Sequence, residues 1–278
     1  MPDATPELPA VVLDAISPTE TRLVLNRRGS TVWDVESRRG RYAVKIGWPI
    51  EAAPGWEAQP WTALAPAREG AILYRLNGDF VAYGEWDQGT WNIQPWREGP
   101  DLYRAWEPCR AEGSSLEPHR SVALGCVEAL AELHAEGWVH GDVQPAHFII
   151  GPERTHLIDL ALARGGRVPE AYDFPFRGCL VHYEAPEISR SVLATGEAEP
   201  TPAADVYALG ASLLISATGW RAVEYPDDAP RAEQRQAVAE HRFRGVDVRG
   251  ELGGIVREML RPAPEDRPTI YEVGKALS

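Results

Sequence analysis

One short stretch, from the end of a predicted helix through a predicted hairpin, restricts the fold more than any other part of the sequence. The apolar stripe of residues 121–136 predicts the helix, and Gly137 supplies its C-terminal cap. The hairpin, residues 147–158, lies between two acids, since Asp142 precedes its first strand and Asp159 follows its second. We therefore expect two carboxylates at the two ends of a small hairpin, able to face one cleft.

The first third of the chain has the alternating pattern of β-strands. In residues 41–46 the alternation places Val44 on one face and Lys45 on the other. A helix over residues 66–76 interrupts the strands. The five expected strands cover residues 21–25, 31–35, 41–46, 80–83 and 90–94, and the first three form an antiparallel meander.

Beyond Gly99 the pattern changes from strands to helices. The expected helices there cover residues 121–136, 203–218, 232–241 and 251–260. A β-rich first part followed by a helical remainder predicts an α+β fold with two lobes. Residues 1–98 form the small β-rich N-terminal lobe, and residues 99–278 form the larger α-helical C-terminal lobe. Ligands bind preferentially at such boundaries, so we expect the functional site there.

Composition excludes several kinds of partner and location. The formal net charge of −13 opposes binding to nucleic acid or to an anionic membrane surface. No run approaches the roughly 18 consecutive apolar residues of a membrane helix, and the acidic, proline-rich start does not resemble a signal peptide. The three cysteines are scattered, which favours a reducing compartment over a disulfide framework. We expect a cytoplasmic protein with neither nucleic-acid nor membrane partners.

Four charged residues in these elements have the chemistry that phosphoryl transfer requires. Lys45 lies on the polar face of a strand and Glu69 lies on the helix that follows, so the two can form an ion pair. Asp142 and Asp159 supply a candidate base and a candidate metal ligand. Each residue also has a simpler explanation, since an isolated strand lysine or helix glutamate is most often a solvated surface charge.

In the order and spacing of these residues, the sequence resembles the protein-kinase fold family from about Thr21 to Leu277. Eight motifs carry the resemblance: the third-strand lysine (43–45), the helix with its glutamate partner (67–73), the fifth strand and hinge (92–102), the catalytic loop (140–148), the metal-binding acid (159–161), the end of the activation segment (183–187) and two later structural motifs (205–210 and 264–269). The triplet His140-Gly141-Asp142 is similar to that of aminoglycoside-phosphotransferase-like kinases. The resemblance implies a bilobal protein-kinase-like fold.

The resemblance implies a site for ATP and Mg²⁺, with Mn²⁺ as an alternative metal. It assigns catalysis to Asp142, Lys45 and Gln144, and metal binding to Asp159 and His147. The residues that it places around the nucleotide are Ser30, Thr31, Ala43, Lys45, Glu69, Gln94, Trp96 and Asp101. Among them, the backbone of the hinge at residues 94–97 is expected to contact adenine, and Asp101 is expected to meet the ribose.

The resemblance also implies structural roles for residues outside the site. Arg267 pairs with Glu187 at the end of the activation segment. Asp205 braces the catalytic loop, and His140 packs beneath that loop. These expectations concern the fold, so a structure tests them directly.

Two departures from the family's pattern concern the phosphates. The loop at residues 28–33 keeps only Gly29, so close backbone contact with phosphates is reduced and the hydroxyls of Ser30 and Thr31 become the candidate donors. Gln144 replaces a lysine that points at the transferred phosphate, and its amide donates a hydrogen bond without a charge.

Two further departures concern the metal and the regulation. His147 replaces an asparagine, and an imidazole suits softer cations such as Mn²⁺ better than Mg²⁺. The alternative is that the His147 ring packs within the lobe and does not face the metal. Gly141 replaces an arginine, which removes the usual partner of a phosphorylated activation segment.

Three functions remain open. The first is an ATP-dependent transferase that moves the γ-phosphate to Ser or Thr of a protein or precursor peptide, as in bacterial modified-peptide biosynthesis beside a partner enzyme. The second is a pseudokinase that presents surfaces to a partner enzyme or peptide. The third is a small-molecule kinase, which the His-Gly-Asp triplet favours. The segment 165–178 and Ala185-Pro186-Glu187 weigh against the third, because they resemble a peptide-docking platform.

Overall fold

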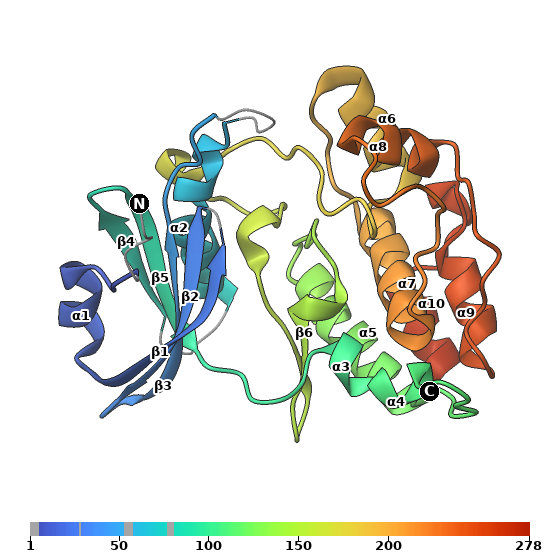
Figure 1. Ribbon diagram of the computed structural model, residues 1–278, viewed down its shortest axis with the longest axis horizontal. Helices are drawn as coiled ribbons and strands as arrows, with labels where there is room; N and C mark the ends of the chain where they lie inside the picture. The colour runs from blue at the N-terminus through green and yellow to red at the C-terminus, as the bar shows by residue number, and fades with distance from the viewer. Residues whose placement is uncertain (1–5, 28, 53–57, 77–80) are drawn as a thin grey trace. The chain divides into compact units, whose positions relative to one another are not determined.

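A five-stranded antiparallel sheet forms the centre of the N-terminal part of the chain (Figure 1). The strand order is β1-β2-β3-β5-β4, so the first three strands form the predicted meander. The strands are β1 (Pro18–Arg27), β2 (Ser30–Ser37), β3 (Gly40–Gly47), β4 (Ala82–Trp86) and β5 (Gly89–Pro95). The structure, a computed structural model, describes residues 6–27, 29–52, 58–76 and 81–278, so the first residue of the predicted strand 80–83 lies outside the described residues.

The two faces of this sheet have different partners. Helix α1 (Ala10–Ile16) lies on one face of the sheet (Figure 1). Its fully buried Val12 packs there in one apolar cluster with Val44 of β3 and Ile93 of β5. Helix α1 was not among the predicted helices, because it has only seven residues and no side-chain cap. Helix α2 (Ala65–Leu76) agrees closely with the predicted helix and covers the opposite face, which we call the α2 face.

A segment from far along the chain, Gly166–Phe174, also packs with the first sheet and α2. Arg68 of α2 is almost fully buried, and its Nε donates a 3.3 Å hydrogen bond to Asp173 Oδ1. The Arg68 guanidinium carbon lies 5.3 Å from the centre of the Phe174 ring. An arginine on the inner side of α2 therefore holds residues 166–174.

Contacts divide the chain into two units. One unit consists of Met1–Trp96 and Gly166–Phe174, and the other consists of Arg97–Gly165 and Pro175–Ser278. The first unit is rich in strands and the second is mainly helical, as the bilobal α+β prediction requires. The sequence predicts a single boundary after residue 98. The return of residues 166–174 to the first unit has no signal in the sequence, because that segment has no periodic pattern.

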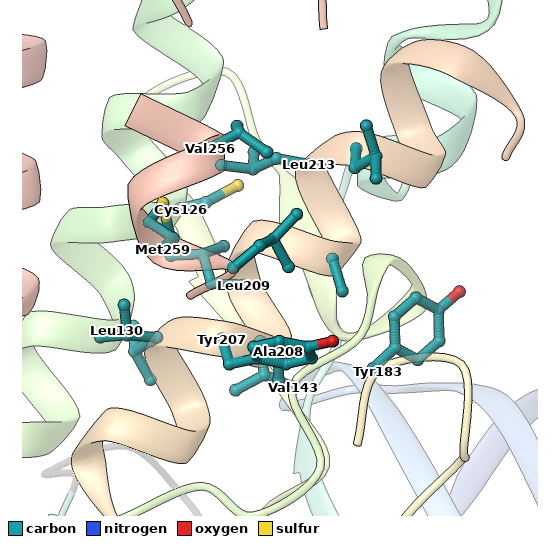
Figure 2. Packing of buried hydrophobic residues seen from close by; sticks show 14 of the residues in the cluster. Cys126, Leu130, Val143, Tyr183, Tyr207, Ala208, Leu209, Leu213, Val256 and Met259 are labelled. Atoms are coloured by element: carbon teal, nitrogen blue, oxygen red, sulfur yellow. The ribbon is translucent and has the colours of Figure 1, made fainter. Parts of the chain in front are cut away.

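The second unit is built around helix α7 (Pro202–Thr218), which is buried along almost its whole length. Figure 2 shows Tyr207, Leu209 and Leu213 of this helix in the core with Met259. A helix that is apolar on all sides is typical of a central position. The other elements of this unit are α3 (Leu102–Ala105), α4 (Glu107–Arg110), α5 (Arg120–Ala135), β6 (Phe148–Ile150), β7 (Thr155–Leu157), α6 (Pro186–Thr195), α8 (Arg231–Ala239), α9 (Leu252–Met259) and α10 (Ile270–Leu277).

The predicted helices and hairpin of the second unit are present. The four helices expected from periodicity correspond to α5, α7, α8 and α9, and the expected hairpin is the antiparallel pair β6–β7. Within the described part of the chain, no helix combines the length and the apolar composition that crossing a membrane requires.

Arg267 forms the expected ion pair with Glu187, the second residue of α6. The two guanidinium nitrogens Nη1 and Nη2 each lie 2.7 Å from a Glu187 carboxylate oxygen. The Arg267 N–H groups also donate to the carbonyl oxygens of Ala203, Arg261 and Pro262. The pair is confirmed, and it joins the end of the activation segment to the turn before α10.

Replacement of Arg267 by leucine is expected to lower the free energy of unfolding by about 3–5 kcal/mol, because Glu187 would remain as a poorly solvated carboxylate without its cation. Urea denaturation followed by circular dichroism measures the change. The double variant Arg267→Leu, Glu187→Leu should recover much of the loss. The exposed Arg257→Leu should stay within about 0.5 kcal/mol of the wild type. A double variant as unstable as the single variant would contradict this account.

Candidate active site

Lys45 and Glu69 form the predicted ion pair inside the first unit. Lys45 points to the α2 face, where its Nζ lies 2.9 Å from Glu69 Oε1 and 2.8 Å from Oε2. Glu69 is 1% exposed, whereas the Lys45 side chain is 16% exposed. A carboxylate buried this deeply needs a cation beside it. The position of Lys45 therefore depends on the position of α2.

The lysine content of the chain also distinguishes Lys45. Lys45 is one of only two lysines in the chain, which has 26 arginines. The other, Lys275, is exposed on α10 with its Nζ 5.0 Å from the centre of the Tyr271 ring. A lysine is a compact point charge, which an arginine fork does not replace. A lysine beside a buried glutamate, in a chain that otherwise uses arginine almost throughout, is consistent with a role that needs this compact charge.

Gly29 is the described residue of the turn between β1 and β2. Gly29 has a φ of +84°, and a Cβ there would lie 2.7 Å from Ile50 Cγ1, so the turn and its packing require glycine. Thr31 is 2% exposed and its Oγ1 accepts a 3.1 Å hydrogen bond from the Trp33 indole N–H, and its phosphate contact stays a prediction. Ser30 is partly exposed and stays a candidate.

The end of β5 carries the residues expected to contact adenine. Gln94 lies opposite Ala43 in the β3–β5 ladder, and its Nε2 donates to Asn92 Oδ1 at 3.2 Å. The Trp96 N–H donates to the Arg41 carbonyl oxygen at 3.0 Å. This N–H was one of the backbone groups expected to bind adenine, and the structure instead uses it within the first unit.

Asp101, the residue expected to meet the ribose, belongs to the second unit. It is the N-cap of α3, and its Oδ1 accepts a 2.9 Å hydrogen bond from the Arg104 N–H. Helix capping accounts for this carboxylate oxygen without a ligand. The ribose contact stays a prediction.

The loop that carries Asp142 is held by the buried Asp205 of α7. Asp205 Oδ2 accepts a 2.7 Å hydrogen bond from the His140 N–H, and Oδ1 accepts a 2.9 Å hydrogen bond from the Gly141 N–H. His134 Nε2 lies 2.9 Å from Asp205 Oδ2. Because both oxygens are used, the carboxylate sets the orientation of two consecutive peptide units. The expected bracing role of Asp205 is confirmed.

Gly141 and His140 give this turn its shape. Gly141 has a φ of +77°, and a Cβ there would lie 3.2 Å from both Leu162 O and Phe176 Cε2. A side chain at position 141 would therefore be strained in this backbone. His140 is fully buried, with Nε2 at 3.0 Å from the Ile158 carbonyl oxygen, and burial lowers its pKa. It packs beneath the loop, as predicted.

The carboxylate of Asp142 keeps one oxygen without a partner. Gln144 Nε2 donates to Asp142 Oδ2 at 3.1 Å, whereas Oδ1 is buried and has no hydrogen-bond partner among the described residues. Burial, and then the charge of Asp159, raise the pKa of Asp142 to about 7, against smaller lowering effects of His140, Gln144 and the nearby backbone amide of Leu180. A carboxylate with such a pKa and an unpartnered oxygen is suited to accept the proton of a hydroxyl group.

Asp159 and His147 lie beside each other at the hairpin. Asp159 has the left-handed backbone angles φ 67° and ψ 63°, which are uncommon for residues other than glycine and cluster at functional sites. His147 Nδ1 lies 2.8 Å from the Asp142 carbonyl oxygen, which only accepts, so Nδ1 carries a hydrogen. His147 Nε2 lies 3.3 Å from Asp159 Oδ2. In a neutral ring this nitrogen directs a lone pair at the carboxylate, so a proton or a cation between them is favourable.

The donor set fits a divalent cation that arrives with further ligands. Among residues 6–27, 29–52, 58–76 and 81–278, no group of three or more His, Cys, Asp or Glu side chains is placed to hold a metal ion. Mg²⁺ sites commonly combine one or two carboxylates with phosphates and waters. Asp159 and His147 therefore fit a metal bound together with a nucleotide, and the imidazole favours Mn²⁺. Whether His147 contacts the metal or only packs within the lobe stays a prediction, and its contact to Asp159 brings its ring to the candidate metal ligand.

Comparison with known proteins places this geometry in a family. No protein-family model matches the chain. The chain is 32% identical over 221 residues to Receptor like protein kinase S.3 of Arabidopsis thaliana. The aligned residues cover 74% of this chain and 57% of that protein. The chain is 31% identical over 225 residues to the serine/threonine-protein kinase PkaA of Streptomyces coelicolor, covering 76% of this chain and 38% of that protein.

A third relative is the serine/threonine-protein kinase PknK of Mycobacterium tuberculosis, which is 28% identical over 164 residues, or 56% of this chain and 14% of that protein. The chain thus spans less than two thirds of the length of each of these relatives. Together with the bilobal fold and the motif order, the comparisons show that the chain belongs to the protein-kinase-like family.

Asp142 is expected to make stability depend on pH. The pKa of its carboxyl rises from 3.8 to about 7, so the folded state binds more protons between these values. The stabilisation from the protonated carboxyl is fully present below about pH 4 and is lost as the pH rises to 7. Asp142→Asn lacks this loss, so it should melt about 3–6 °C above the wild type at pH 8 and close to it at pH 4. Thermal melts without divalent cations measure the difference, and a difference that does not vary with pH would refute it.

Proposed function

We propose that this chain is an ATP-dependent phosphotransferase that acts on Ser or Thr hydroxyl groups of a protein or peptide. The observation that carries the proposal is the Asp142 carboxylate, which keeps a buried unpartnered oxygen in a turn held by Asp205. Such an oxygen is a costly feature unless a ligand group uses it. A substrate hydroxyl group is the natural donor for it.

Each of the other residues has a role in this proposal. Lys45, oriented by Glu69, binds the phosphates of ATP. Gln144 holds the Asp142 carboxylate so that Oδ1 faces the hydroxyl group. Asp159 and His147 would hold a divalent cation, which neutralises phosphate charge when bound. Asp142 accepts the hydroxyl proton as the oxygen attacks the γ-phosphate, and ADP leaves.

The names of the relatives support a protein or peptide as the phosphate acceptor. Two of the three relatives described above are named serine/threonine-protein kinases, which supports a Ser or Thr hydroxyl acceptor. A precursor peptide that is modified further by a partner biosynthetic enzyme is a narrower form of the same proposal. A small-molecule acceptor is the alternative that a comparison of peptide and small-alcohol substrates would distinguish.

A second candidate is a pseudokinase that binds a partner enzyme or peptide without transferring phosphate. Two observations in the first unit favour it. The Thr31 side chain is buried and accepts a hydrogen bond from Trp33, and the Trp96 N–H donates to the Arg41 carbonyl oxygen. Transfer of phosphate by the wild type separates the two candidates.

Replacement of Lys45 by alanine is expected to weaken ATP binding by about 10–100-fold, because a charge-assisted contact to phosphate is lost. Isothermal titration calorimetry with and without Mg²⁺ measures the affinity.

Asp142→Asn should retain ATP binding but lose phosphate transfer from labelled ATP by at least about 10²-fold. Lys275→Ala is the matched control, and both its affinity and its rate should equal those of the wild type. Equal ATP affinity for Lys45→Ala and the wild type would refute the proposed nucleotide site.

His147 is expected to determine the metal preference. With its imidazole beside Asp159, Mn²⁺ should support nucleotide binding at least as well as Mg²⁺. His147→Asn supplies an oxygen and should improve the nucleotide affinity in Mg²⁺ relative to Mn²⁺ by about 3–10-fold, whereas His147→Ala should weaken binding in both metals. Parallel titrations measure these ratios. Wild-type behaviour of both variants in both metals would remove His147 from the site.

A further inference from the structure

Three buried polar side chains occupy alternate positions of β5 on the α2 face. Thr90, Asn92 and Gln94 are 2%, 0% and 7% exposed, while Trp91 and Ile93 between them belong to the apolar cluster on the opposite face. A sheet face that packs against a helix is ordinarily apolar. Buried polar groups of this kind are destabilising unless they are hydrogen-bonded, so their partners indicate what they do.

Thr90 and Asn92 bind the backbone at the start of α2. Thr90 Oγ1 accepts a 3.1 Å hydrogen bond from the Ala67 N–H, one of the groups that a helix N-terminus leaves without an intrahelical acceptor. The same hydroxyl donates to the Ala63 carbonyl oxygen at 2.6 Å. Asn92 Nδ2 donates to the Pro66 carbonyl oxygen at 2.8 Å. The strand therefore fixes the first turn of the helix.

Asn92 also reaches the ion pair itself. Its Nδ2 lies 3.1 Å from Glu69 Oε2, the oxygen that lies 2.8 Å from Lys45 Nζ. Asn92 and Lys45 are directly opposite each other in the β3–β5 ladder. Gln94 Nε2 donates to Asn92 Oδ1 at 3.2 Å, which fixes the orientation of the Asn92 amide. One side chain thus contacts the helix backbone and the glutamate.

We infer that Asn92 is a positioning residue for Lys45. Its amide donates one hydrogen bond that holds α2 and one that holds the Glu69 carboxylate, so the place of the Lys45 ammonium is set by β5. This anchor lies entirely within the first unit. It keeps the ion pair formed without a phosphorylated activation segment, which agrees with the glycine at position 141.

Because the chain has only two lysines, the reactivity of Lys45 can be measured against that of Lys275 in the absence of nucleotide. An ammonium held by a carboxylate reacts slowly with acylating reagents, because the unprotonated amine is the nucleophile. Partial acetylation followed by peptide mass spectrometry gives the ratio of Lys45 to Lys275 modification, with Lys275 as the internal reference. The variants to compare are Asn92→Leu, Thr90→Val and Glu69→Gln.

Asn92→Leu is expected to raise the Lys45 to Lys275 ratio about threefold or more, towards the larger rise of Glu69→Gln. Thr90→Val removes an anchor of α2 that does not touch Glu69, so it should leave the ratio unchanged even where it lowers the melting temperature. Asn92→Ser, which is too short to reach Glu69, should behave as Asn92→Leu if the leucine variant does not fold. An unchanged ratio in the Asn92 variants, or an equal rise in Thr90→Val, would overturn the inference.

The effect of Asn92 on ATP affinity rests on the proposed function, and it is measured in a separate experiment. Asn92→Leu should weaken ATP binding by about tenfold in calorimetry, and Thr90→Val should not. A wild-type protein that binds no ATP would refute the proposed function, while the acetylation ratios would still decide the role of Asn92.

Discussion

A single buried carboxylate, that of Asp205, holds the part of the second unit that carries the candidate chemistry. It accepts hydrogen bonds from the consecutive N–H groups of His140 and Gly141, which restricts the turn to one conformation. Asp205 is itself fixed, because it lies in the first turn of the buried helix α7. The Asp142 carboxylate can keep an unpartnered oxygen and a raised pKa only where its surroundings prevent it from turning to a new partner.

The first unit likewise depends on a buried carboxylate, that of Glu69, which is held by donors from neighbouring elements. Glu69 is buried with Lys45, and Asn92 donates to the same carboxylate, so removal of either partner leaves a poorly solvated anion. The polar side chains of β5 hold α2 from the strand side, and Arg68 holds residues 166–174 through Asp173. Helix α2 therefore has anchors on the sheet and on residues 166–174.

Several departures from the family's pattern have local physical reasons. Gly141 has a left-handed φ and close neighbours, so the arginine common at this position would be strained. Gly29 is required by its own φ and by Ile50, and the Thr31 hydroxyl is used in packing. These positions serve the fold of this chain, whereas Asp142 keeps a feature that the fold alone does not require.

The sequence by itself determined the order of the elements and the residues that carry charge. Alternation and helical periodicity are local properties, so β1 to β3, α2, the hairpin and α7 lie where the pattern predicted them. The order of the motifs likewise identified the pairs Lys45–Glu69 and Arg267–Glu187. Only the tertiary structure decided features that depend on neighbours distant in the chain. These are the return of residues 166–174 to the first unit, the contact of His147 with Asp159, and the fixing of Glu69 by Asn92. Each results from which side chains packing brings within hydrogen-bond distance, and no local pattern contains that information.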